Sequence, residues 1–203
     1  MNKKLKTPGI RTFDRKMVPS RIKLRVADKK RRFPLTLISK NDICAEIGVL
    51  GGEFSSLILD KGPKELHLID PWIMQEEYKG RCYGKDAGQE SLSKFYNHVV
   101  NKFKNRSEVT IHKNFSTDVK FSPKYFDWVY IDGNHSYAFV LKDLEFYYPF
   151  MKDGGYLCGD DIGWGDGNDG GPRRAVNEFT KTHNLPFKIR GTQFVIEIKN
   201  KKT

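Results

Sequence analysis

Apolar and polar positions along the chain follow two spacings in turn, and this alternation predicts an α/β fold. Short apolar runs predict buried strands near residues 43–48, 65–70, 109–114, 126–132 and 155–160. Apolar residues three and four positions apart predict helices near 53–60, 89–104, 137–151 and 172–183. Because strands and helices alternate, we expect a parallel sheet with helices on both faces.

The end of the chain departs from this alternation. Two strand-like segments, 187–190 and 194–198, flank Gly191 and Thr192. A glycine-containing turn between two strands is typical of a β-hairpin. We therefore expect an antiparallel hairpin at the end of a mostly parallel sheet.

A glycine-rich turn follows the first predicted strand. The stretch from Glu46 to Gly51 reads acid-x-Gly-x-x-Gly, with Gly48 at the first glycine position. Glycine lets a backbone turn tightly and approach a ligand without a Cβ clash. The spacing differs from the dinucleotide motif G-x-G-x-x-G, and no Gly-Lys-Ser/Thr follows as in a phosphate-binding P-loop. The pattern resembles the first motif of class I S-adenosylmethionine-dependent methyltransferases, which implies that Glu46, Gly48 and Gly51 bind this cofactor.

A second acid, Asp70, ends the next predicted strand. In a doubly wound sheet, an acid at this place can accept hydrogen bonds from ribose hydroxyls. The alternative is that Asp70 only begins the turn with Pro71, which is a common role of aspartate. The glycine motif upstream favours the ribose interpretation.

The basic charge is concentrated at one end of the chain. Residues 1–32 hold 13 Lys and Arg against two Asp, so the whole net charge of +11 lies there. We expect a basic N-terminal arm over 1–35 and a methyltransferase-like domain over 36–203. Such an arm can bind nucleic acid, an anionic surface or a phosphorylated substrate, or it can be a solvated tail that aids solubility.

Composition narrows the cellular setting. No run of about 18 apolar residues is present, so we expect no transmembrane helix. The basic N-terminus lacks the apolar stretch of a secretory signal. The three cysteines, Cys44, Cys82 and Cys158, form no C-x-x-C pair. This favours reduced thiols and a cytoplasmic location over a disulfide framework or a zinc site.

Two irregular segments, 71–88 and 162–171, follow predicted strands and lack clean periodicity. Loops at such places often cover a cofactor or substrate. We expect the first to cover the site and the second to act as a substrate lid.

Three further acids follow the fourth and fifth predicted strands: Asp132, Asp160 and Asp161. Ligands bind beyond the carboxyl ends of the strands in an open α/β sheet, so these acids should meet there. Converging carboxylates repel one another unless a cation is present, and hard oxygen ligands favour Mg²⁺. Such an ion could lower the pKa of a substrate hydroxyl. The alternative is that Asp132 caps a turn or touches the methionine end of the cofactor, with the acid pair in a polar loop without metal.

The sequence around these acids carries a more specific resemblance. Residues 130–137 read Y-I-D-G-N-H-S-Y, residues 152–155 read K-D-G-G, and residues 159–161 read G-D-D. Over about residues 40–200 the chain resembles the small, type-24-like class I methyltransferases and is similar to catechol and sugar O-methyltransferases. The resemblance implies a Rossmann-like, doubly wound, seven-stranded sheet whose last strand is antiparallel. It also implies magnesium ligation by the three acids and contact of Asp132 and Ser116 with the cofactor.

One position departs from the catechol-type pattern. Those enzymes carry a catalytic lysine three residues after the first metal ligand, whereas this chain has His135 three residues after Asp132. A neutral histidine is a competent general base near pH 7, so we expect His135 and Asp132 to be catalytic. The alternative is that His135 only stabilises the turn from Gly133 to Tyr137.

The leading hypothesis is an S-adenosylmethionine-dependent O-methyltransferase that acts on a small molecule or sugar with Mg²⁺ assistance. One alternative is a nucleic-acid methyltransferase that uses residues 1–32, although the Asn/Asp-Pro-Pro-Tyr/Phe motif of base-methylating enzymes is absent. Others are a non-catalytic cofactor-binding module and a hydroxylase-like metal enzyme on the same scaffold. The sequence leaves the acceptor and the oligomeric state open.

Overall fold

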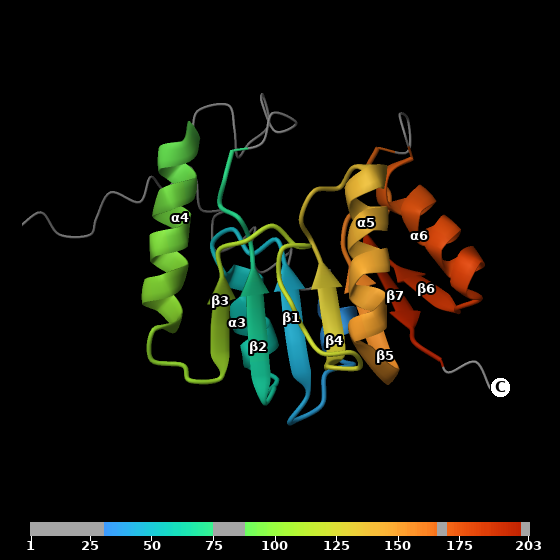
Figure 1. Cartoon of the computed structure of the whole chain (residues 1–203), viewed down its shortest axis with the longest axis horizontal. Coiled ribbons are helices and arrows are strands. Elements are labelled where there is room, and N and C mark those ends of the chain that lie inside the picture. Colours follow the sequence, from blue (N-terminus) through green and yellow to red (C-terminus); the bar gives the residue numbers. More distant parts are fainter. Residues whose placement is uncertain (1–30, 75–87, 166–169, 200–203) are drawn as a thin grey trace, which may run out of the picture.

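The computed structural model describes residues 31–74, 88–165 and 170–199. These residues form a seven-stranded sheet with the order β3-β2-β1-β4-β5-β7-β6 (Figure 1). The strands are β1 (Ile43–Ile47), β2 (Glu65–Ile69), β3 (Val109–His112), β4 (Phe126–Ile131), β5 (Met151–Gly159), β6 (Phe187–Arg190) and β7 (Gln193–Glu197).

The strand directions confirm the expected fold class. Strands β1 to β5 pair in parallel, whereas β7 is antiparallel to both β5 and β6. The hairpin turn at Gly191 has φ of +65°, a conformation that favours glycine. The doubly wound, mostly parallel sheet with an antiparallel C-terminal hairpin is therefore present as predicted.

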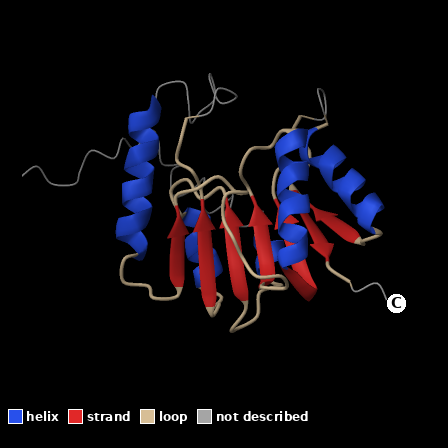
Figure 2. Cartoon of the chain, in the orientation of Figure 1, coloured by secondary structure: helices blue, strands red, loops and turns tan. Residues whose placement is uncertain are grey.

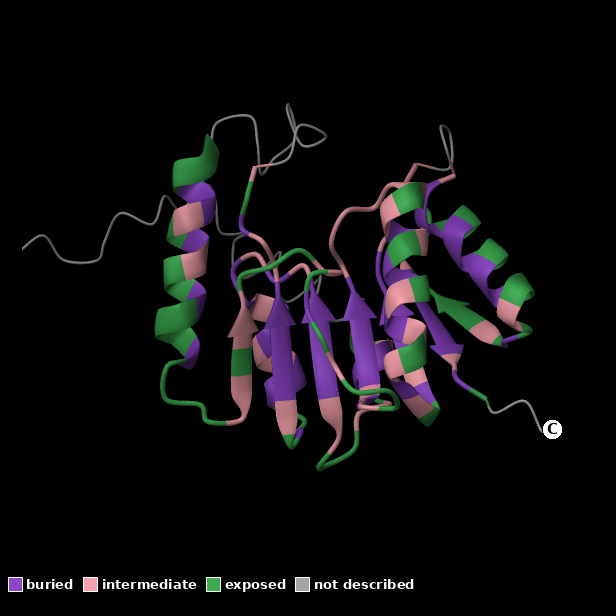
Figure 3. Cartoon of the chain, in the orientation of Figure 1, coloured by how far each residue is buried: buried purple, intermediate pink, exposed green. Residues whose placement is uncertain are grey.

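Helices cover both faces of the sheet (Figure 2). One core layer lies between the sheet and helices α5 and α6, and the other lies between the sheet and helices α2, α3 and α4. Neighbouring residues of β1 point to opposite layers: Ala45 belongs to the first and Cys44 to the second. Both faces of the central strands are buried (Figure 3), which explains why these strands read as apolar runs without alternation. The helices are α2 (Arg32–Leu35), α3 (Glu53–Leu59), α4 (Gly88–Phe103), α5 (Tyr137–Tyr147), η2 (Tyr148–Phe150) and α6 (Gly171–His183).

The expected helix over 137–151 is wrong at its C-terminal end. Helix α5 ends at Tyr147, a short 3₁₀ turn follows, and β5 begins at Met151. Pro149 lies in that turn, and proline lacks the N–H group that would continue an α-helix. The spacing of the apolar residues continues past Tyr147 and therefore did not indicate this end of the helix.

The short helix α2 was not expected from the sequence. It packs on the sheet through Leu35, which is buried, and through the carbonyl of Pro34, which accepts a hydrogen bond from the indole N–H of Trp128. This contact fixes the described end of the basic segment beside β4. Residues 1–30 lie outside the described residues, so the division between arm and domain stays a prediction.

The strand order places the site. The chain runs from β1 outward to β3 and then returns to β4 on the other side of β1. Ligands bind at the carboxyl ends of the strands at such a reversal. Among the described residues, no helix is long and apolar enough to cross a membrane.

Candidate active site

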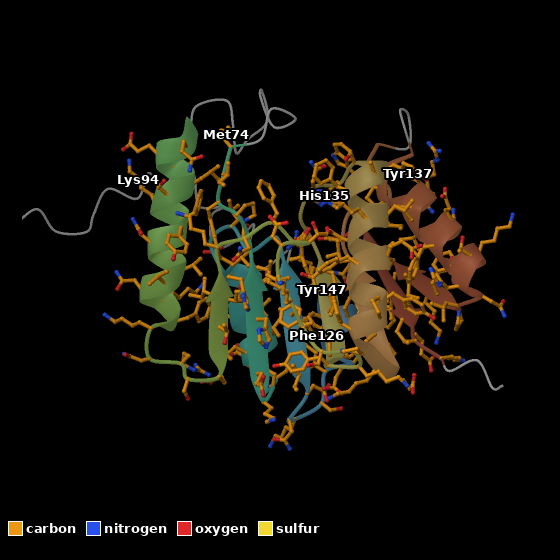
Figure 4. All side chains as sticks on the ribbon, viewed as in Figure 1. Met74, Lys94, Phe126, His135, Tyr137 and Tyr147 are labelled. Carbon is orange, nitrogen blue, oxygen red and sulfur yellow. The ribbon has the colours of Figure 1, made fainter. Side chains whose placement is uncertain are left out.

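A pocket of about 480 Å³ opens where the strand order reverses, at the carboxyl ends of β1, β2 and β4. Figure 4 shows His135 above the strands at this end of the sheet. Most residues expected at the site line this pocket: Glu46, Gly48, Asp70, Ser116, Asp132, His135 and Asp161. Gly51 and Asp160 are not among the residues that line it.

The glycine turn brings two strand ends into close contact. Gly48 has φ of +87°, and its N–H donates to the carbonyl of Ile69 at 2.9 Å. A Cβ atom at Gly48 would lie 2.3 Å from the carbonyl oxygen of Asp132. Gly51 is less constrained, because an added Cβ would meet only the flexible side chain of Glu53. Glycine at position 48 is thus required by the packing of the turn against β4.

Glu46 is a fully buried acid at the base of the pocket. Its carboxylate accepts a hydrogen bond from the hydroxyl of Ser55, at the start of α3. Burial raises the pKa of Glu46 to about 8, and the hydrogen bond from Ser55 limits the rise.

Asp70 holds the glycine turn in place. One carboxylate oxygen, Oδ2, accepts the backbone N–H groups of Val49 at 2.9 Å and Leu50 at 3.0 Å. The other oxygen, Oδ1, accepts the N–H of Trp72 at 2.7 Å. Asp70 thus has structural contacts both to the glycine turn and to the residue after Pro71, while the expected ribose contact stays a prediction. Oδ2 already accepts two N–H groups, whereas Oδ1 accepts one, so a ribose hydroxyl would bind at the second lone pair of Oδ1.

Trp72 is the second residue of the segment 71–88, which the sequence predicts as a cover. Its ring is buried, and its indole N–H donates to the carbonyl of Leu50 at 2.9 Å. Trp72, Ile73 and Met74 line the pocket. Most of the remaining predicted cover, 75–87, lies outside the described residues, as do residues 166–169 of the predicted lid.

Ser116 is anchored by a buried acid of helix α5. Its hydroxyl donates to Oδ1 of Asp143 at 2.5 Å, and the neighbouring Phe115 is exposed at the pocket rim. Burial raises the pKa of Asp143 to about 7. The pair fixes Ser116 in the lining of the pocket, where the resemblance implies contact with the cofactor.

Two of the three expected metal ligands, Asp132 and Asp160, lie on either side of a residue of the basic segment. The Arg31 guanidinium donates from Nη1 to Oδ2 of Asp132 at 2.7 Å. It donates from Nε to Oδ2 of Asp160 at 2.6 Å. Burial raises the pKa of Asp132 to about 7, and the attraction of Arg31 opposes the rise. Asp161 lies beside this pair with its side chain 43% exposed.

His135 faces the same acids from the pocket side. Its Nε2 atom lies 3.4 Å from Oδ1 of Asp132 and 3.3 Å from Oδ2 of Asp161. The ring also contacts the indole of Trp164. A proton on Nε2 would be stabilised by the two carboxylates.

The comparisons with known proteins agree with this geometry. A family model described as a methyltransferase domain (Methyltransf_24) matches residues 45–162, which include the glycine turn and the acids. The chain belongs to this methyltransferase family. A relative from Acanthamoeba polyphaga mimivirus, named "Uncharacterized protein R132", is 31% identical over 137 residues. The match covers 60% of this chain and only 52% of that relative, so it spans about half of the relative's length.

Solved methyltransferase structures share the fold. The N-methyltransferase NodS from Bradyrhizobium japonicum WM9, in complex with S-adenosyl-L-homocysteine, has a TM-score of 0.58 at 12% identity, covering 88% of this chain and 87% of its own. Fibrillarin from Aeropyrum pernix, with natively bound S-adenosyl-L-methionine, has a TM-score of 0.54 at 13% identity, covering 87% and 74%. At these identities the likeness establishes the class I methyltransferase fold alone.

The magnesium expectation is not supported in this methyltransferase domain. Mg²⁺ needs oxygen ligands at about 2.0–2.1 Å in near-octahedral order. Here the guanidinium of Arg31 already binds the facing oxygens of Asp132 and Asp160. Among the described residues, no group of three or more acids, histidines or cysteines is arranged to hold a metal ion. As they stand, the carboxylates do not fit the ion.

Sequence reasoning missed two site residues of this domain. Arg31 was counted only as charge of the basic arm, and no local pattern connects it with acids about a hundred residues later. Asp143 was given no role by the sequence patterns. Its position as an acid on the buried face of an amphipathic helix was the signal that could have singled it out.

Replacing Asp143 with asparagine should raise stability at high pH. The folded-state pKa of Asp143 is about 7, against 3.8 for an unperturbed aspartate. Between these values the folded state keeps a proton that the unfolded state has lost, so the Asp143 contribution to stability falls as pH rises from about 4 to 7. Asparagine still accepts from Ser116 but cannot ionise. The free energy of unfolding of Asp143→Asn should therefore exceed that of the wild type by about 4 kcal/mol at pH 8 and match it near pH 4.

Urea unfolding across this pH range checks the prediction, and the difference between variant and wild type isolates Asp143 from other titrating groups. The Asp118→Asn variant, at an exposed acid of the same pocket, is the matched control and should follow the wild type. If the free energy of unfolding of Asp143→Asn depended on pH in the same way as that of the wild type, Asp143 would not be protonated in the folded state.

Proposed function

We propose that the protein transfers a methyl group from S-adenosylmethionine to a hydroxyl oxygen of a small molecule or sugar. The observation that carries the proposal is one pocket that joins the glycine turn at Gly48 to the cluster of His135, Asp132 and Asp161. A cofactor-binding turn and a proton-accepting group then face the same cavity. Oxygen as the receiving atom rests on the resemblance to catechol and sugar O-methyltransferases.

The residues present suit this chemistry. When bound, S-adenosylmethionine supplies an electrophilic methyl group and leaves as a neutral thioether. The chain must align the acceptor and take up the proton that its hydroxyl loses as the new carbon–oxygen bond forms. We assign the uptake of that proton to Nε2 of His135, and the nearby carboxylates of Asp132 and Asp161 support this assignment because they favour the imidazolium. Glu46, Gly48, Gly51, Asp70 and Ser116, together with Asp132, are the residues proposed to bind the cofactor.

The setting of the reaction is also part of the proposal. The two described cysteines, Cys44 and Cys158, are buried free thiols, which supports the expected cytoplasmic location. Of the basic segment proposed to bind nucleic acid, only residues 31 and 32 are described, and the structure adds no observation for that alternative.

Thermal unfolding in the presence of S-adenosylhomocysteine tests the proposal first. A ligand that binds only the folded state should raise the melting temperature, by the equivalent of about 2.7 kcal/mol at a hundredfold excess over its Kd. S-adenosylmethionine consumption with a panel of sugars and phenols then separates an enzyme from a binding module. An unchanged melting temperature at millimolar S-adenosylhomocysteine would contradict the methyltransferase proposal. A raised melting temperature without turnover would favour the binding module.

A further inference from the structure

The acid cluster lies around a cation that the chain itself provides. The Arg31 guanidinium binds Asp132 through Nη1 at 2.7 Å and Asp160 through Nε at 2.6 Å. Each of the two donors binds a different carboxylate, and such charge-assisted hydrogen bonds are shorter and stronger than those between neutral groups. These two acids come from the ends of the adjacent strands β4 and β5.

The surroundings hold this guanidinium in place. Its central carbon lies 5.6 Å from the ring centroid of Phe54, which itself packs on Tyr130 of β4. The backbone next to Arg31 is fixed by α2, where the carbonyl of Pro34 accepts from Trp128 at 3.1 Å. The Arg31 side chain is only 28% exposed. Contacts to the side chain and to the adjacent helix thus hold the Arg31 guanidinium at a fixed position.

Both carboxylate oxygens of Asp160 accept hydrogen bonds in this arrangement. Its Oδ1 accepts the hydroxyl of Thr192 at 2.6 Å, while its Oδ2 binds Arg31. The side chain of Asp160 is 4% exposed, and a buried carboxylate without a counter-charge is strongly destabilising. Arg31 therefore satisfies the need for a cation that the sequence had assigned to Mg²⁺.

We propose that Arg31 takes the place of a divalent metal ion in this site, so that the enzyme positions Asp132 and Asp160 without metal. Arg31 is a positioning residue: it acts through Asp132, which in turn lies beside His135. The inference rests on the proposed function only for the reaction that these acids serve, since the pairing itself is a property of the folded chain. Methyl transfer should accordingly be insensitive to EDTA.

Metal binding by the whole protein tests the proposal without any acceptor. Manganese, followed by electron paramagnetic resonance, and magnesium, followed by the melting temperature, are titrated into the wild type and Arg31→Met. The wild type should show no saturable site in the millimolar range. Arg31→Met should melt at a lower temperature in EDTA, bind one manganese ion at least tenfold more tightly than the wild type, and regain melting temperature with magnesium.

Matched variants distinguish a cation site left empty by the substitution of Arg31 from a general loss of structure. Arg32→Met removes the exposed neighbouring arginine and should behave as the wild type. Arg31→Lys keeps a cation and should stay unresponsive to manganese. Asp160→Asn combined with Arg31→Met should lose the acquired metal site.

Two results would overturn the proposal. One is a stoichiometric manganese site in the wild type that Asp160→Asn abolishes, because the metal would then displace Arg31. The other is no gain of metal binding in Arg31→Met, or, if that variant does not fold, manganese binding by Arg31→Lys. Binding of S-adenosylhomocysteine is measured separately, so failure of the methyltransferase proposal leaves this result interpretable.

Discussion

Replacing Gly48 with alanine is expected to abolish cofactor binding and to lower the free energy of unfolding by more than about 3 kcal/mol. The new Cβ would lie 2.3 Å from the carbonyl oxygen of Asp132 and 2.7 Å from Cα of Gly133. These are backbone atoms, so no rotation of a side chain relieves the overlap. The carboxyl ends of β1 and β4 would have to separate at the point where the pocket forms. Urea unfolding and calorimetric titration with S-adenosylhomocysteine measure both effects.

Gly154 provides the matched control for this substitution. It has nearly the same backbone conformation, with φ of +81°, but no atom lies within 4 Å of an added Cβ. The Gly154→Ala variant should therefore show only the strain of a left-handed conformation, about 1–2 kcal/mol, with unchanged nucleoside affinity. Equal losses in the two variants would show that the contact with β4 is unimportant.

Much of this pocket is predictable because its signals lie at strand ends. Glu46, Asp70 and Asp132 each end or follow an apolar run, and parallel strands bring their carboxyl ends to one edge. The hairpin is equally local, since Gly191 and the two flanking strands are neighbours in sequence. The expected fold class and the convergence of the acids both followed from such local patterns.

The parts that escaped prediction depend on contacts between distant segments. The Arg31–Asp132 pair joins residues 101 positions apart, and the Ser116–Asp143 pair joins residues 27 positions apart. Net charge showed that the first segment was basic but not which acid an arginine would meet. A cluster of carboxylates is compatible with a metal ion or a guanidinium, and only the packing of α2 distinguishes them.

The largest effect on catalysis is expected at His135. Replacement with alanine should lower turnover by a factor of about 10² to 10⁴, the usual contribution of a positioned general base. Binding of S-adenosylhomocysteine should change little, because the Nε2 atom faces Asp132 and Asp161 and the glycine turn is untouched. The measurement is S-adenosylhomocysteine release with an acceptor identified by the sugar and phenol panel.

Added imidazole distinguishes a base from a residue that only stabilises its turn. It should restore part of the turnover of His135→Ala, since it can accept the proton in the vacated space, but it cannot repair a distorted Gly133–Tyr137 turn. His183→Ala is the matched control: this histidine also pairs with a carboxylate, that of Glu145 at 2.9 Å, but does not line the pocket. It should keep wild-type turnover. A His135→Ala variant with lost turnover, weakened nucleoside binding and no response to imidazole would assign His135 to the turn and leave another group to take the proton.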